Sequence, residues 1–227
     1  MNRTIFFLSF ILSMIIILSC EKNNDDSGDE NNSTVINDSI YAGIYDTSFY
    51  YFEFPSPIEL DFVWDSSMIY GNANDSIMLY SGSDSLYIKF RLTELNPDSI
   101  NVIQNTGIVP MLSVMVHDSI SVYEVTRTYY IGQGSTTNIT FAQAFHKHDV
   151  IRSNGNWHSN YTNIPNRWLE LWVMPTDPGT ISNFHGGPWL QLSIGYLGFR
   201  YKNHLGWLKI NNTYPKNPKF ISYAIRK

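Results

Sequence analysis

The sequence predicts an all-β fold, in the form of an antiparallel two-sheet sandwich or jelly roll with at most one short helix. From residue 39 onward, short runs of alternating apolar and polar residues are separated by clusters of Gly, Pro, Asn, Asp and Ser. This pattern is typical of strands joined by hairpin turns. The strand–helix–strand alternation that would indicate a parallel sheet is missing. The expected strands are residues 48–54, 58–64, 76–81, 85–92, 111–117, 119–125, 168–174, 189–201, 205–211 and 219–226.

One segment, residues 140–148, has a helical pattern instead. Phe141, Phe145 and His148 recur there at helical spacing, and Thr140 precedes them as an N-cap. We therefore expect the single short helix at this point of the chain.

Residues 1–19 have the pattern of a signal peptide. Arg3 supplies a positive charge, and the apolar stretch from Ile5 to Leu18 is shorter than the ~20 residues that a membrane-spanning helix needs. The stretch ends in Ile17-Leu18-Ser19-Cys20, which resembles the bacterial lipobox except for the bulky Leu18. An ordinary signal peptide followed by a chance cysteine is the alternative interpretation.

The lipobox resemblance implies that Cys20 is lipidated and becomes the mature N-terminus. Two or more acyl chains hold a protein stably on a membrane. Glu21 stands where an aspartate would retain a lipoprotein at the inner membrane, so the resemblance favours the outer membrane. We expect a cell-envelope protein whose membrane partner is reached through this lipid, on either the periplasmic or the extracellular face.

Residues 20–38 are predicted to form the lipidated cysteine and a flexible acidic tether. Residues 21–38 carry six acidic residues and one lysine and have few apolar side chains, so they cannot bury enough surface to order themselves. A flexible coil of this length has a mean reach of roughly 25 Å. The remaining residues, 39–227, are enough for a single β-sandwich domain with a sizeable core.

The charges of this domain are unevenly distributed along the chain. Residues 39–126 carry eleven acidic and two basic residues, whereas residues 127–227 carry three acidic and eleven basic ones. The simplest interpretation is that the two halves pack together and partly neutralise each other. A basic surface for an acidic polymer is the alternative. No run of Lys and Arg with interleaved aromatics occurs, so we expect no nucleic-acid partner.

A short motif, Asp-Ser followed by Ile or Leu, recurs five times. Asp and Ser close turns by bonding their own backbone, and the aliphatic residue then opens the next strand. Glycosylation of the serines, known in a similar context in some Gram-negative bacteria, is a compatible second interpretation. The serines concerned are Ser39, Ser76, Ser85, Ser99 and Ser119.

The C-terminal part contains four landmarks, which are the segment AFHKHDVIRSNGNW at residues 144–157, YLGFR at 196–200, GWLKI at 206–210 and Tyr223-Ala224. Together they resemble a group of exported β-rich proteins that includes PEP-CTERM-type proteins and lipoproteins. The resemblance covers roughly residues 142–226 and implies a β-rich fold and export. It implies no enzymatic activity, and the segment at residues 58–65 lacks the dense oxygen ligands of a calcium loop. We expect no cofactor.

In a strand, successive side chains point to opposite sides, and this alternation along three expected strands predicts a sheet face rich in tryptophan. In the segment WLELWV at residues 168–173, Leu169, Leu171 and Val173 share one side, and the residues between them share the other. A carboxylate such as Glu170 does not belong unpaired in a dry core, so this second side is expected to be wet. If the strands are neighbours, the candidate ligand-binding residues are Trp168, Glu170, Trp172, Trp189, Gln191, Trp207 and Lys209.

Flat aromatic rings among hydrogen-bonding groups are suited to stacking on the apolar faces of sugars. The sequence is therefore interpreted as a non-catalytic recognition or structural module of the envelope whose ligand is a glycan or an envelope protein. The alternatives are that these tryptophans cover the core with Glu170 paired to Lys209, or that the protein is a polysaccharide-acting glycoside hydrolase with Glu170 as acid or base. Hydrolysis needs a second carboxylate that the sequence does not identify.

A second candidate is a metal site at His146 and His148. On a strand these two residues would share a face, as two metal ligands do, but a third and a fourth ligand are not identifiable. We therefore predict no metal site, with these two histidines as the weak candidates.

Overall fold

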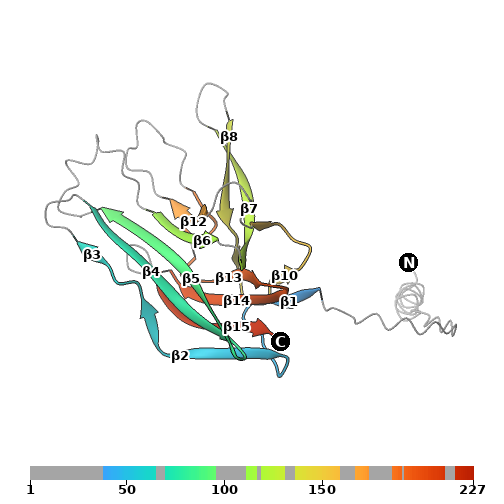
Figure 1. Ribbon diagram of the computed structural model, residues 1–227. Helices are drawn as coiled ribbons and strands as arrows, with labels where there is room; N and C mark the ends of the chain where they lie inside the picture. Colours follow the sequence, from blue (N-terminus) through green and yellow to red (C-terminus); the bar gives the residue numbers. More distant parts are fainter. Residues whose placement is uncertain are drawn as a thin grey trace, which may run out of the picture. The chain divides into compact units, whose positions relative to one another are not determined.

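The computed structural model describes residues 38–64, 70–95, 111–116, 119–130, 136–158, 167–173, 186–190, 192–212 and 218–227. The regular structure of these residues is entirely β, as Figure 1 shows, so the all-β prediction is confirmed. The signal peptide, Cys20, the tether and Gln191 lie outside the described residues. The strands are β1 (Ser39–Tyr41), β2 (Phe49–Glu59), β3 (Val63–Trp64), β4 (Tyr70–Ser81), β5 (Asp84–Leu95), β6 (Met111–Val116), β7 (Ile120–Tyr130), β8 (Thr136–Ala142), β9 (Ala144–Phe145), β10 (Val150–Arg152), β11 (Trp157–His158), β12 (Arg167–Val173), β13 (Ile194–Tyr201), β14 (His204–Asn211) and β15 (Lys219–Arg226).

Most of the strands belong to one continuous sheet with the order β2-β15-β14-β13-β7-β8-β12-β6-β5-β4-β3. The short strands β11 and β9 pair with β7 and β13, and β1 and β10 form a separate two-stranded ribbon. The pairs are antiparallel except for β12 and β8, which run parallel where Glu170 meets Phe141. The expectation of a purely antiparallel arrangement is wrong at this one junction.

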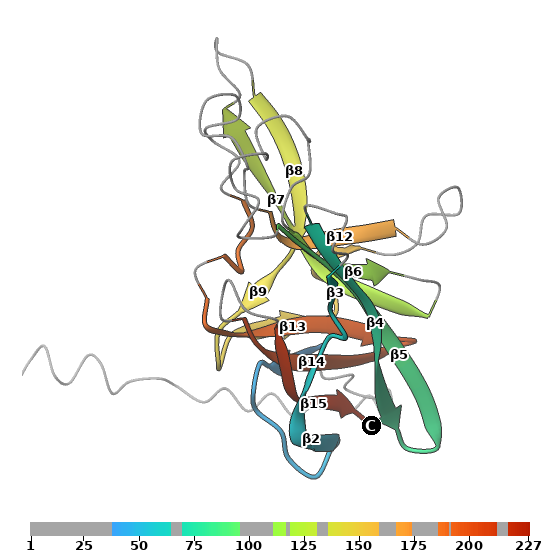
Figure 2. The same ribbon diagram turned by 90° about the vertical axis from the view of Figure 1, so that its left-hand side faces the viewer.

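The main core lies between the two halves of this sheet, which is therefore sandwich-like. Inward side chains of β13, β14 and β15 belong to the same buried cluster as those of β4, β5, β6 and β12. Phe90 of β5 and Phe220 of β15 meet across the core, with ring centroids 4.5 Å apart. The hairpin of β7 and β8 joins the two halves and extends away from the other strands, as Figure 2 shows.

A second, smaller core lies behind β13, β14 and β15. The ribbon of β1 and β10 supplies Ile40 and Ile151, which are buried in one cluster with Leu205 and Trp207 of β14. The protein therefore has three layers, namely the ribbon, the β13–β15 half of the sheet, and the β4–β6 and β12 half. The middle layer is buried on both faces, which explains why nearly every residue of β13 is buried.

The helix expected at residues 140–148 does not form. β8 continues through Ala142, β9 follows at Ala144–Phe145, and His148 adopts a left-handed turn conformation with φ 76°. The hydroxyl of Thr140 lies 3.1 Å from that of Thr126 on β7 instead of capping a helix. Three residues at helical spacing are a weak signal, and pairing of this segment with β7 and β13 outweighs it.

The Asp-Ser motif marks strand starts at some positions and not at others. Ser39, Ser85 and Ser119 lie at or just before the first residues of β1, β5 and β7, as expected. Ser76, however, lies in the middle of β4, opposite Lys89 of β5, so the turn interpretation is wrong there. Ser99 lies outside the described residues.

The expected neutralisation between the acidic and the basic half of the chain is confirmed by the ion pairs. The ion pairs His158–Glu124, Lys202–Asp84 and Lys219–Glu59 each take their acidic partner from residues 39–126 and their basic partner from residues 127–227. Lys202 Nζ lies 2.8 Å from Asp84 Oδ2, and Lys219 Nζ lies 2.5 Å from Glu59 Oε1. Both of these pairs are exposed, so they contribute little stability. They nevertheless place opposite charges from the two halves of the chain beside each other.

Candidate functional site

The tryptophan-rich face predicted from the sequence does not exist as one surface. Trp172 and Trp189 are buried in the main core, and Trp207 is buried in the smaller core behind β14. Lys209 follows Trp207 on the same side of β14. Of the residues predicted for this face, Trp168 and Glu170 are the ones that point outward from β12.

A β-bulge on β12 explains the misplacement of Trp172. Glu170 pairs with Ser113 of β6, but Trp172 pairs with Leu112, the very next residue of that strand. Leu171 is therefore an extra residue, and the alternation reverses after it. As a result, Leu169, Leu171 and Trp172 are all buried in the core.

The buried tryptophans have hydrogen-bond partners, as indole N–H groups in a core require. Trp172 Nε1 donates to Asn212 Oδ1 at 3.0 Å, Trp189 Nε1 to the carbonyl of Ala142 at 3.1 Å, and Trp207 Nε1 to the carbonyl of Ile44 at 3.2 Å. The interpretation that tryptophans cover the core is thus correct for these three. The suggested pairing of Glu170 with Lys209 is wrong, because β12 and β14 lie on opposite sides of the main core.

The outward side of β4, β5, β6 and β12 forms a different surface, which we call the outer face. The four strands are neighbours in the order β12-β6-β5-β4, and Figure 2 shows them running side by side. Apart from Asp75, their described core-facing residues are apolar or glycine and are buried, and the alternate residues point to the other side. Ser113 and Met115 of β6 belong to this outward side, although they are themselves buried. The outer face consists of Asn72, Asn74, Ser76, Met78, Tyr80, Ser85, Tyr87, Lys89, Arg91, Thr93, Met111, Ser113, Met115, Trp168 and Glu170.

Two rows of paired residues cross the outer face at its centre. One row runs Asn74, Arg91, Ser113 and Glu170, and the next runs Ser76, Lys89, Met115 and Trp168. The register thereby brings a cation from β5 close to an aromatic ring from β12, although they are far apart in the sequence. Arg91 and Glu170 are two strands apart, or about 10 Å between backbones.

The guanidinium of Arg91 is stacked against the indole of Trp168. Arg91 Cζ lies 4.8 Å from the centroid of the Trp168 ring, and Arg91 Nη2 lies 4.0 Å from Met111 Sδ. Cation–π contact and apolar packing hold the guanidinium plane in place. Arg91 is partly exposed, and its Nε is buried, so any bond to a ligand comes from the terminal nitrogens of the guanidinium. Within the described residues Arg91 forms no ion pair.

Further aromatic residues lie at the other end of the outer face. Tyr80 and Tyr87 are 55% and 43% exposed, and Met78 beside them is 46% exposed. Lys89 Nζ lies 5.5 Å from the centroid of the Tyr87 ring. Sequence reasoning overlooked these residues, although the alternation in residues 85–92 already placed Tyr87, Lys89 and Arg91 on one side of a strand.

The outer face carries a single carboxylate in its described part, that of Glu170. Retaining and inverting glycosidases position two carboxyl groups on either side of the scissile bond, about 5–10 Å apart. The arrangement is therefore suited to binding through donors, a carboxylate acceptor and flat rings. The described part of the outer face does not contain the second carboxylate that a hydrolase of this kind would need.

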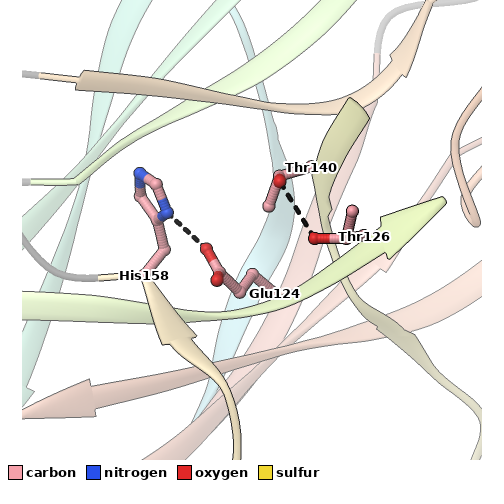
Figure 3. Close-up of polar contacts among 4 residues, drawn as sticks. All are labelled: Glu124, Thr126, Thr140 and His158. Carbon is pink, nitrogen blue, oxygen red and sulfur yellow. Dashed lines mark hydrogen bonds and ion pairs between the residues drawn. The ribbon is translucent and has the colours of Figure 1, made fainter. Parts of the chain in front are cut away.

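A second polar cluster lies where β7 meets β11 and β8, drawn in Figure 3. His158 is buried, and its Nδ1 forms a short contact with Glu124 Oε2 of β7, while the hydroxyls of Thr126 and Thr140 bond each other. Figure 3 shows the second ring nitrogen of His158 directed away from both threonines. The cluster thus fastens β11 to β7 and does not form a base–nucleophile arrangement with either threonine. Sequence reasoning did not single out either partner.

His146 and His148 lie in the exposed turn between β9 and β10, not on a strand. The backbone N–H of His146 donates to Asp149 Oδ2 at 2.6 Å. Among the described residues, no group of three or more His, Cys, Asp or Glu side chains could hold a metal ion.

Comparisons of the chain with protein-family models, with curated proteins and with solved structures found no match. The resemblance of the C-terminal part to exported β-rich proteins therefore stays a prediction. A helix long and apolar enough to cross a membrane is absent from the described part of the chain.

Proposed function

We propose that this protein is a lipid-anchored envelope lipoprotein whose outer face binds a glycan without cleaving it. The observation that carries the proposal is the stack of Arg91 on Trp168, with Glu170 in the same row as the arginine. This arrangement supplies a flat ring, charged donors and a carboxylate acceptor on one face of the sheet, where all three side chains are partly exposed. The lipid anchor is supported by the signal-peptide pattern of residues 1–19 and by the lipobox-like segment that ends at Cys20.

The chemistry of the outer face is suited to a sugar chain. The C–H face of a pyranose ring packs on an indole or a phenol ring, while its hydroxyls accept from Arg91 and Lys89 and donate to Glu170. Tyr80 and Tyr87 extend the aromatic surface along the hairpin of β4 and β5. A ligand lying across the strands would therefore contact rings and polar groups in turn.

A glycan array probed with the mature chain carrying Cys20→Ser tests this proposal. Trp168→Ala should weaken binding by about 30-fold, the loss typical of a central aromatic residue worth 2 kcal/mol. The matched control is Tyr41→Ala, which removes an exposed aromatic residue from the β1–β10 ribbon and should leave binding unchanged. Absence of glycan binding, or binding that Trp168→Ala leaves intact, would overturn the assignment of the outer face.

Glu170→Gln separates binding from hydrolysis on any glycan that binds. A binding module should tolerate the loss of this charge in part, because the amide keeps an acceptor oxygen. Release of reducing ends by the unmodified protein, abolished in the Glu170→Gln variant, would show a hydrolase instead.

A further inference from the structure

The end of the protein formed by the ribbon carries an exposed apolar cluster. Tyr41 is 53% exposed, Tyr45 47%, Ile44 37% and Val150 36%. Tyr41 and Val150 are directly paired across the ribbon. Ile44 and Tyr45 belong to the loop that follows β1, and the ring of Tyr45 is stacked on Tyr51 with centroids 3.6 Å apart.

Basic side chains surround this cluster. The turn that holds Lys147 is tied to the β1 loop, because the backbone N–H of His148 donates to the carbonyl of Ala42 at 2.9 Å. Arg152 is paired with Ser39 on the ribbon, and Arg226 Nη1 donates to the carbonyl of Ser39 at 3.0 Å. Lys227 Nζ donates to the carbonyl of Thr47 at 2.6 Å.

The surface also contains acidic groups, so it is not strongly basic. Asp46 Oδ1 accepts from Ser48 Oγ and from the backbone N–H of Ser48, and these bonds lower the pKa of the Asp46 carboxyl. Asp38 and Asp149 lie near the ribbon as well. Tyrosine rings and aliphatic side chains bordered by mixed charges are characteristic of the interfacial zone of a bilayer.

The chain enters the described structure at this same surface. Asp38 is the first described residue, and Ser39 lines a cavity of about 290 Å³ together with Tyr41, Ile44, Tyr45 and Arg226. The eighteen residues between Cys20 and Ser39 have a mean reach of roughly 25 Å. A lipid on Cys20 would therefore keep this surface within reach of the bilayer.

We propose that the ribbon surface, meaning Tyr41, Ile44, Tyr45 and Val150 with the basic residues around them, rests on the lipid headgroups of the membrane that holds the anchor. This inference rests on the lipid anchor of the proposed function. The outer face lies beyond both other layers of the protein. Docking through the ribbon therefore turns the glycan-binding surface away from the membrane.

The anchor supplies the affinity and the ribbon surface sets the orientation. Four partly exposed side chains bury too little apolar area to hold a protein on a bilayer by themselves. Accordingly, the mature chain with Cys20→Ser should not float with vesicles, whereas the lipidated chain should.

Single-cysteine labelling of the lipidated mature chain in phosphatidylcholine vesicles tests the orientation. Cys20 is the only cysteine of the chain and its thiol is consumed by the lipid, so an introduced cysteine takes a polarity-sensitive dye alone. With spin-labelled lipid in the vesicles, the dye at Tyr41→Cys or Ile44→Cys should shift to the blue and lose fluorescence. The matched control is Tyr87→Cys on the outer face, which should show neither change.

The failures of the two proposals are distinguishable. If the protein does not float with the vesicles, the anchor is wrong, and the docking falls with it. If it floats but the dye at residue 41 is quenched no more than the dye at residue 87, the docking alone is wrong. Adding Tyr45→Asp and Val150→Asp to Tyr41→Cys should reduce quenching at residue 41 and leave flotation unchanged, and quenching that persists would also overturn the docking.

Discussion

Replacing Asn212 by alanine tests whether a buried polar bridge holds the two large tryptophans of the main core. Asn212 is 4% exposed and directly follows β14. Its Oδ1 accepts from Trp172 Nε1 at 3.0 Å, and its Nδ2 donates to the carbonyl of Trp189 at 2.8 Å. The side chain thus connects the bulged strand β12 to the turn that precedes β13.

The expected cost follows from these two bonds. In the alanine variant the buried indole N–H of Trp172 loses Asn212 as a partner, which costs about 1–3 kcal/mol. The carbonyl of Trp189 also loses Asn212 but still accepts from the backbone N–H of Leu192 at 3.2 Å, so this second loss adds little. We therefore expect the free energy of unfolding to fall by about 2 kcal/mol, which for a domain of this size lowers Tm by roughly 4–8 °C.

Urea unfolding followed by tryptophan fluorescence measures the effect, since the midpoint shifts with stability at constant slope. The matched control is Asn138→Ala, which removes an exposed bond from Thr128 Oγ1 at 2.8 Å. Such a surface change should cost no more than about 0.5 kcal/mol. An Asn212→Ala variant as stable as the Asn138→Ala variant would refute the reasoning.

Three further predictions concern the packing of the domain. Gly43→Ala should lower Tm clearly, because Gly43 has a φ of 71° and an added Cβ would lie 2.6 Å from the Tyr196 ring; a thermal melt checks this. Trp172→Ala should cost about 3–5 kcal/mol, far more than Trp168→Ala, and equal costs in urea would contradict the assignment of Trp172 to the core. Burial raises the pKa of Tyr51 from 10.0 to about 12, so between these pH values only the unfolded chain loses this proton. Stability should therefore fall as pH rises through that window, and Tyr51→Phe should show a smaller fall in alkaline urea titrations.

Alternation along single strands was a reliable guide to the fold where the strands are regular. In β5 it separated buried Leu86, Ile88 and Phe90 from outward Tyr87 and Lys89. The method failed at β12, because the position of a bulge depends on the register with β6 and leaves no mark in the sequence of either strand. It also failed at Trp189 and Leu190, which belong to a turn and not to the strand expected there, so that Trp189 is buried in the core.

Short and non-local elements were the other source of error. β1 and β10 have three residues each, too few for a periodic signal, and they are stabilised by covering Leu205 and Trp207. The segment at residues 140–148 is extended because β7 and β13 offer it backbone partners. A propensity argument limited to neighbouring residues cannot weigh such contacts.

The sequence by itself determined that the described part of this protein is all-β, because an alternating pattern over many short runs is compatible with half-buried strands and with little else. The uneven charges of its two halves also favoured their packing together, which the ion pairs between them confirm. Only the tertiary structure decided which residues share a surface, because strand order and register are chosen by contacts between distant segments. That choice buried Trp172, Trp189 and Trp207, and it brought Arg91 onto Trp168.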